Sequence, residues 1–116
     1  MAFVPSGSKT LLTIPGLGRL TGTCQPDGAW VTWTNTTTGD LDFWSDVAFP
    51  NGAVVHPNQG VVVQSTVDRD ASGDFSIGAG KDPGPRRVAT FRANALQDGT
   101  GAPCGFQAQG TTWASP

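Results

Sequence analysis

The sequence predicts one all-β domain over residues 1–116, folded as an Ig-like or jelly-roll-like β-sandwich of eight or nine short strands. Three observations predict this class. The length of 116 residues is typical of a single domain. The chain contains no Glu and is rich in Thr, Val and Gly, whereas helices favour Glu, Lys, Leu and Ala. Its 16 Gly and 9 Pro recur at short intervals, as turn residues do between short strands.

The first half of the chain alternates at period two, as strands do. A flexible N-terminal arm is expected over residues 1–8, followed by a Thr, Leu and Ile run at 9–14 and a second strand at 19–24. The third strand, at 29–35, follows a Pro-Asp-Gly turn, in which proline presets φ and glycine accepts a positive φ. The fourth, at 40–47, places Leu, Phe and Val on one face and Asp and Trp on the other.

The second half is divided by turns at closer intervals. A short strand is expected at 53–56, after Pro-Asn-Gly. Residues 60–67 form the most apolar run, which predicts a central strand. A polar turn over 68–73 then precedes a brief strand at 74–77, and the chain closes with a strand at 104–113.

Residues 85–99 fit two structures. A proline at the start, a glycine after the end and apolar residues at helical spacing suit a helix. The alternating small residues around Thr90 and Phe91 favour a strand at 87–95 instead, and we adopt the strand. The inward faces of all these strands supply one expected core, made of Leu20, Val31, Trp33, Leu41, Phe43, Val47, Val61, Val63, Phe91 and Phe106.

Cys24 and Cys104 are the two cysteines of the chain. No CxxC pair or Cys/His cluster accompanies them, which argues against a zinc site. Either they are buried free thiols in a reducing compartment, or they form one disulfide between an early strand and the last one. We favour the disulfide, which implies an oxidising location outside the cell. With Trp33 they loosely follow the Cys…Trp…Cys order of immunoglobulin domains, but the second interval is too long for a true one.

Three stretches carry a family resemblance: GLGRLTGTC at 16–24, WTNT at 33–36 and CGFQAQ at 104–109. They resemble small secreted β-domains of high-GC Gram-positive bacteria, a largely uncharacterised group. The resemblance implies export and a disulfide, and it implies no activity. In size and composition the chain is also similar to β-sandwich proteins that decorate phage capsids or tails.

The chain start bears on location. Residues 1–9 lack the apolar run of a signal peptide, and no stretch reaches transmembrane length, so no membrane span is expected. Either Met1 was added to a mature secreted domain, or the protein is made without export. The first interpretation suits an extracellular protein and the second suits a virion component.

Charge and motifs argue against two functional classes. The net charge of −2 provides no basic surface, so nucleic-acid binding is not expected. The chain has no G-x-S-x-G or HExxH motif and no Glu to pair with an Asp as general acid and base. His56 is the sole histidine and is expected at the surface rather than in catalysis. We therefore expect no enzyme and no catalytic residue.

A short acidic segment resembles half of a calcium loop. Asp68, Asp70, Ser72 and Asp74 place oxygen ligands at alternate positions, and Gly73 occupies the position of the loop glycine. The twelfth position, however, is an alanine where a bidentate Glu is expected, and no helices flank the loop. The other interpretation is a solvated turn, in which Asp and Gly only shape the backbone.

The outward face of the strand at 40–47 is the second candidate site. Trp44 is expected there between Asp42 and Asp46, with Trp30 beside it on a paired strand. An exposed indole serves protein interfaces, and flanked by carboxylates it also suits a sugar ring. The alternative is that a loop or the other sheet covers Trp44. Asn35 also begins an N-x-T glycosylation sequon.

Together these features predict a non-enzymatic structural or binding module, extracellular or on a particle surface, that needs no cofactor. A virion decoration or tail protein is one alternative, and a carbohydrate-binding module is another. The expected partner is another protein or a second copy of the chain, bound through a β face, with a glycan as the alternative ligand.

Overall fold

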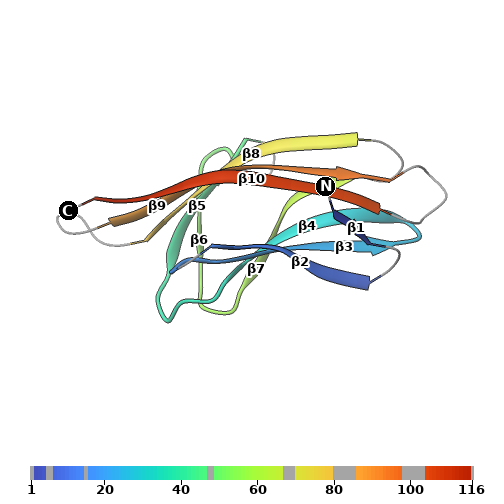
Figure 1. Ribbon diagram of the computed structural model, residues 1–116. Coiled ribbons are helices and arrows are strands. Elements are labelled where there is room, and N and C mark those ends of the chain that lie inside the picture. Colours follow the sequence, from blue (N-terminus) through green and yellow to red (C-terminus); the bar gives the residue numbers. More distant parts are fainter. Residues whose placement is uncertain are drawn as a thin grey trace.

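A computed structural model of the chain describes residues 2–4, 7–14, 16–46, 49–66, 70–79, 86–97 and 104–115. Within these ranges the protein is all-β, without a helix. Ten strands form two antiparallel sheets that pack face to face as a β-sandwich (Figure 1). The predicted fold class is therefore confirmed, with ten strands in place of the expected eight or nine.

The two sheets differ in size, and each contains a meander of three consecutive strands. The six-stranded sheet has the order β1 (Ala2–Val4), β10 (Cys104–Ser115), β9 (Arg86–Leu96), β8 (Asp70–Ala79), β5 (Leu41–Ser45) and β6 (Ala53–Val55). The four-stranded sheet has the order β2 (Gly7–Ile14), β3 (Gly18–Gln25), β4 (Gly28–Asn35) and β7 (Gly60–Thr66).

Three of the predicted elements are settled by this topology. The ambiguous segment is strand β9, as adopted, and not a helix. The expected N-terminal arm over 1–8 is wrong for Ala2–Val4, which pair with β10, and for Gly7 and Ser8, which begin β2. The expected central strand is also wrong, because β7 lies at the edge of the four-stranded sheet.

All four sheet edges are short or irregular. The outer strands of the six-stranded sheet, β1 and β6, have 3 residues each. In the four-stranded sheet, the ladder of edge strand β2 shifts register between Thr10 and Leu12. The ladder of edge strand β7 shifts opposite Val31 and Thr32. Short strands and bulges are the means by which natural sheets avoid edge-to-edge pairing.

One hydrophobic core fills the space between the sheets. The Trp33 ring of β4 stacks on the Phe43 ring of β5, with ring centroids 5.4 Å apart. Gly22 makes room for Phe106, since a Cβ at Gly22 would lie only 2.8 Å from that ring. Of the predicted core residues that the structure describes, Val61 is partly buried and the other eight are buried. Val47 lies outside the described residues.

The disulfide joins the two sheets. Cys24 of β3 and Cys104 of β10 are bonded, with their Cα atoms 5.6 Å apart, and both are buried. The predicted link between an early strand and the last one is therefore confirmed. Because β3 and β10 belong to different sheets, the bond fixes one end of the sandwich.

Candidate functional site

The outer face of the six-stranded sheet carries the strongest candidate site. On β5, Leu41 and Phe43 are buried, whereas Asp42 and Trp44 point outward. This alternation is the one that the sequence predicts. Trp44 is 40 % exposed, which makes it one of the few large apolar side chains on the described surface. An indole that is exposed on a sheet face is available to a ligand or a partner.

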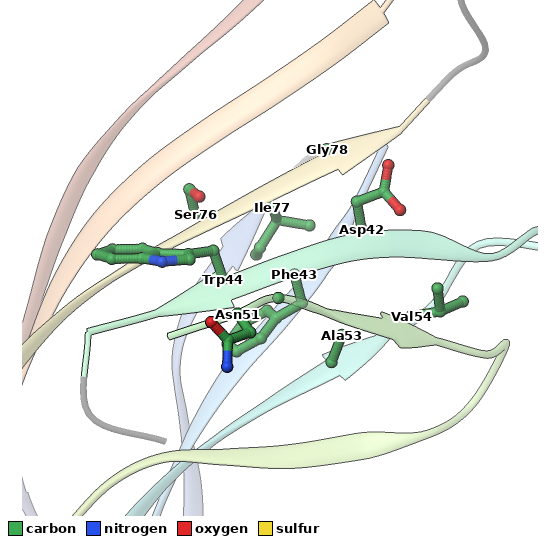
Figure 2. Close-up of a pocket in the computed structure, with 10 residues that line it drawn as sticks. Asp42, Phe43, Trp44, Asn51, Ala53, Val54, Ser76, Ile77 and Gly78 are labelled. Carbon is green, nitrogen blue, oxygen red and sulfur yellow. The ribbon is translucent and has the colours of Figure 1, made fainter. Parts of the chain in front are cut away.

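The Trp44 ring is held in place at one edge. Its Nε1–H donates a hydrogen bond to the main-chain carbonyl oxygen of Pro50, at 3.0 Å. Figure 2 shows the indole extending from β5 beside Ser76 of the neighbouring strand β8. With its polar edge already bonded within the protein, the ring offers an apolar surface of fixed orientation.

Trp44 and Ser76 stand between two open hollows. The first, of about 570 Å³, extends toward β6 and is lined also by Asp42, Asn51 and Val54. The second, of about 620 Å³, extends over β8, β9 and β10 and is lined also by Arg92 and Gln109, among others. A ligand that covers the indole can therefore continue to either side of it.

Strand register aligns polar side chains into two rows beside the ring. Trp44 pairs with Ser76, Ser76 with Thr90, and Thr90 with Thr111, so a row of three hydroxyls on β8, β9 and β10 continues from the indole. The next row runs through Asp74, Arg92 and Gln109. We call this surface the Trp44 face, made of Asp42, Trp44, Asp46, Asp74, Ser76, Thr90, Arg92, Gln109 and Thr111.

An ion pair stands at the centre of the second row. Arg92 Nε and Nη2 donate to the two carboxylate oxygens of Asp74, at 2.8 and 3.3 Å. The Arg92 hydrogen bond holds the pKa of the Asp74 carboxyl below its usual value. Asp46 lies close by, because its Oδ1 accepts a hydrogen bond from the Asp74 main-chain N–H at 3.2 Å. Both side chains of the pair are about half exposed, so their remaining capacity for hydrogen bonds faces solvent.

Trp30 does not belong to this surface. The expectation that it lies beside Trp44 on a paired strand is wrong, because β4 pairs with β3 and β7 and not with β5. Trp30 instead points outward from the four-stranded sheet, beside a smaller hollow of about 310 Å³ that Thr23 and Val62 also line. The outward direction of Trp30 was predictable from alternation, but the sheet to which its strand belongs was not.

The acidic segment at 68–74 is part strand. Asp68 lies outside the described residues, and β8 begins at Asp70, so residues 70–73 belong to a strand and not to the expected polar turn. The Asp74 carboxylate is bonded to Arg92. Among the described residues, no group of three or more His, Cys, Asp or Glu side chains is placed to hold a metal ion. Calcium binding at Asp68, Asp70, Ser72 and Asp74 stays a prediction of the sequence alone.

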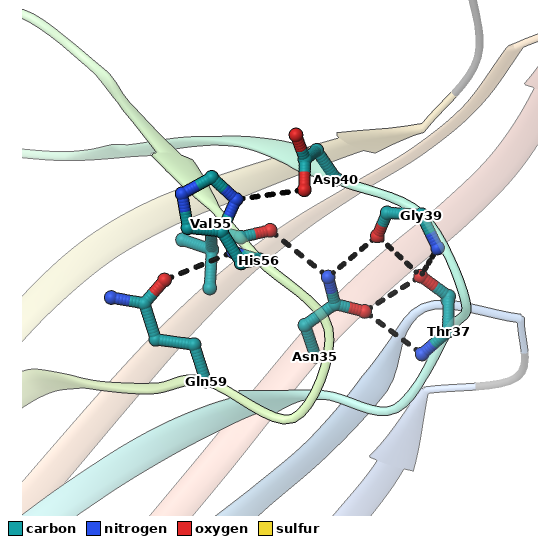
Figure 3. A network of polar contacts seen from close by, with 7 residues as sticks. All are labelled: Asn35, Thr37, Gly39, Asp40, Val55, His56 and Gln59. Carbon is teal, nitrogen blue, oxygen red and sulfur yellow. Dashed lines mark hydrogen bonds and ion pairs between the residues drawn. The ribbon is translucent and has the colours of Figure 1, made fainter.

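A separate polar network surrounds Asn35 at the end of β4 (Figure 3). Its Nδ2 donates to the carbonyl oxygens of Gly39 and Val55, at 2.8 and 3.0 Å. Its Oδ1 accepts from the main-chain N–H and the hydroxyl of Thr37, at 2.8 and 2.7 Å. Asn35 is fully buried. The sequon asparagine is thus a structural residue that holds two loops together, and its amide is not accessible to glycosylation in the folded chain.

His56 lies at the outer side of this network. Its Nδ1 is 2.8 Å from Asp40 Oδ1, and both side chains are more than half exposed. The main-chain N–H of His56 donates to Gln59 Oε1 at 2.9 Å. The expected surface position of His56 is confirmed, and its contacts tie the turn after β6 to the loop before β5.

Comparison with protein-family models, with curated proteins and with solved structures gave no match for this chain. The site is therefore interpreted from its own geometry. In the described ranges, no helix has the length and apolar character needed to cross a membrane.

Proposed function

We propose that this protein is a non-enzymatic binding module that acts in an oxidising environment and contacts its ligand or partner through the Trp44 face. The observation that carries the proposal is Trp44 itself, a 40 % exposed indole whose ring is fixed by Pro50 between two hollows. Large aromatic side chains are the residues that most often anchor a contact surface.

A face is a better contact surface here than an edge. The sheet edges are short or bulged, which disfavours the addition of a strand from another chain. The Trp44 face, by contrast, spans neighbouring strands in regular register. This arrangement of the strands supports recognition through side chains on the Trp44 face rather than through main-chain pairing at an edge.

The two cysteines and the histidine of the chain are engaged away from the two hollows. Both cysteines form the disulfide. His56 pairs with Asp40 at the surface, and neither residue lines the two hollows beside Trp44. A general base oriented by a carboxylate needs a nucleophile within hydrogen-bond reach, and the described contacts of His56 are with Asp40 and Gln59 alone. These contacts support a binding role over a catalytic one.

The disulfide supports a location outside the reducing cytosol. Such bonds persist on secreted proteins and on particle surfaces. The resemblance of residues 16–24 and 104–109 to secreted bacterial β-domains favours an extracellular protein over the surface of a virion. In either place the module presents the Trp44 face to solvent.

The substitution Trp44→Ala tests the proposal. Because the ring is partly exposed, the free energy of unfolding should fall by no more than about 1–2 kcal/mol, less than for a core tryptophan. Binding of the ligand, or self-association, should weaken by about 2 kcal/mol or more. Urea denaturation measures the change in the free energy of unfolding. Sedimentation velocity measures self-association of the protein alone and binding in the presence of a panel of neutral glycans. A loss of stability of several kcal/mol without any effect on association would show that Trp44 is a core residue.

A further inference from the structure

The ligand class of the Trp44 face follows from its chemistry. We infer that the face binds a neutral glycan chain, stacked on Trp44 and hydrogen-bonded by the polar rows of β8, β9 and β10. This inference rests on the proposed function and adds the identity of the ligand class. It is carried by the fixed indole, the composition of the surrounding side chains and the charge of the face.

The indole provides the apolar part of the site. A sugar ring has one face of C–H groups, and these are attracted to the negative π face of an aromatic ring. Trp44 suits such a contact because its N–H is bonded to Pro50, so the ring is already oriented before a ligand arrives. The hollows on both sides of the ring leave room for further sugar units, which favours a chain over a single sugar.

The flanking rows provide the polar part. Sugar hydroxyls both donate and accept, and the rows offer both functions. The Asp74 carboxylate accepts and the Arg92 guanidinium donates, and their mutual ion pair keeps the two groups in one orientation. Thr90, Thr111 and Gln109 extend the rows with exposed hydroxyl and amide groups. A few oriented polar groups around an aromatic surface are what small-ligand sites use to fix their ligands.

Charge separates a neutral glycan from other ligands. Asp42, Asp46 and Asp74 outnumber Arg92, so the face is net negative and repels anionic polysaccharides and nucleic acids. A protein partner fits less well, because the centres of protein interfaces are depleted in charged residues. Here three carboxylates and one guanidinium share the face with the exposed indole of Trp44.

Affinity electrophoresis of the intact protein tests the inference. Native gels that contain galactomannan, xyloglucan, laminarin or glycogen are compared with gels that contain alginate or heparin. We expect retardation by at least one neutral polysaccharide and none by the anionic ones. Trp44→Ala should raise the Kd derived from the retardation about 30-fold or more, and Arg92→Ala should raise it about tenfold. Trp30→Ala is the matched control, since it removes an outward tryptophan from the other sheet and should leave retardation unchanged.

The outcomes separate this inference from the proposed function. If none of the four neutral polysaccharides retards the protein, or if retardation persists in Trp44→Ala, the inference of a neutral glycan is overturned. If no neutral polysaccharide retards the protein but Trp44→Ala abolishes its self-association in sedimentation velocity, the inference of a glycan ligand is overturned. The proposed function of the Trp44 face as a contact surface is then retained. If Trp44→Ala changes neither glycan binding nor self-association, the proposed function fails as well.

Discussion

Replacement of Trp33 by alanine is expected to lower the free energy of unfolding by about 4 kcal/mol, a large part of the stability of a domain of this size. Trp33 is fully buried at the centre of the core and stacks on Phe43 across the sandwich. In the described part of the chain its indole N–H has no hydrogen-bond partner, so the loss comes from packing alone. Urea denaturation followed by far-UV circular dichroism measures the change.

Trp30→Ala is the control for this prediction as well. Trp30 is on the same strand as Trp33 but points out of the four-stranded sheet, so its replacement should cost much less than the loss of a buried tryptophan. Equal losses for the two variants would contradict the inward and outward faces assigned to β4. A Trp33→Ala variant that fails to fold would agree with the prediction, provided that Trp30→Ala folds.

Removal of the disulfide should have an effect of similar size. The bond closes a loop with a sequence separation of 80 residues. In the chain-entropy account, opening such a loop lowers the free energy of unfolding by about 4 kcal/mol, because the unfolded chain regains conformational freedom. The variant Cys24→Ala/Cys104→Ala is compared with the oxidised protein by denaturation in guanidinium chloride.

Mass spectrometry provides the control for the disulfide. Alkylation of the native, unreduced protein should leave both cysteines unmodified, and reduction by an added thiol should increase the intact mass by two hydrogen atoms. Two thiols alkylated without reductant would contradict the bond. A loss of less than about 1 kcal/mol in the double variant would contradict the stabilisation by loop closure.

The faces of individual strands were predictable, but their neighbours in the sheets were not. Alternation assigned Val31 and Trp33 inward and Trp30 outward, and the structure agrees, because a pleated strand sends successive side chains to opposite faces. The apolar run 60–67 predicts a central strand, yet β7 is an edge strand. A local run of valines reports burial of one face, whereas a position within the sheet is set by pairing between distant segments.

The candidate site was predictable in the same partial way. The outward direction of Trp44 followed from the buried residues that alternate with it on β5. Arg92, Gln109 and the hydroxyl row were missed, because they reach Trp44 only through the register of β8, β9 and β10 with β5. The burial of Asn35 has a local signal in the sequence. Asn35 continues the inward positions of Val31 and Trp33, where a polar side chain must find internal hydrogen bonds.

The most direct test of the central claim, that the Trp44 face is the contact surface, is a nuclear magnetic resonance titration. The chain has 4 Trp, so each indole N–H can be assigned by single Trp→Phe variants and followed separately. The ¹⁵N-labelled protein is titrated with a hexasaccharide of each neutral glycan, and separately with unlabelled protein. The account predicts that the Trp44 indole and the amides of β5, β8 and β9 shift together while the Trp30 indole does not. Shifts confined to the Trp30 side of the sandwich, or none at Trp44 in any titration, would contradict it.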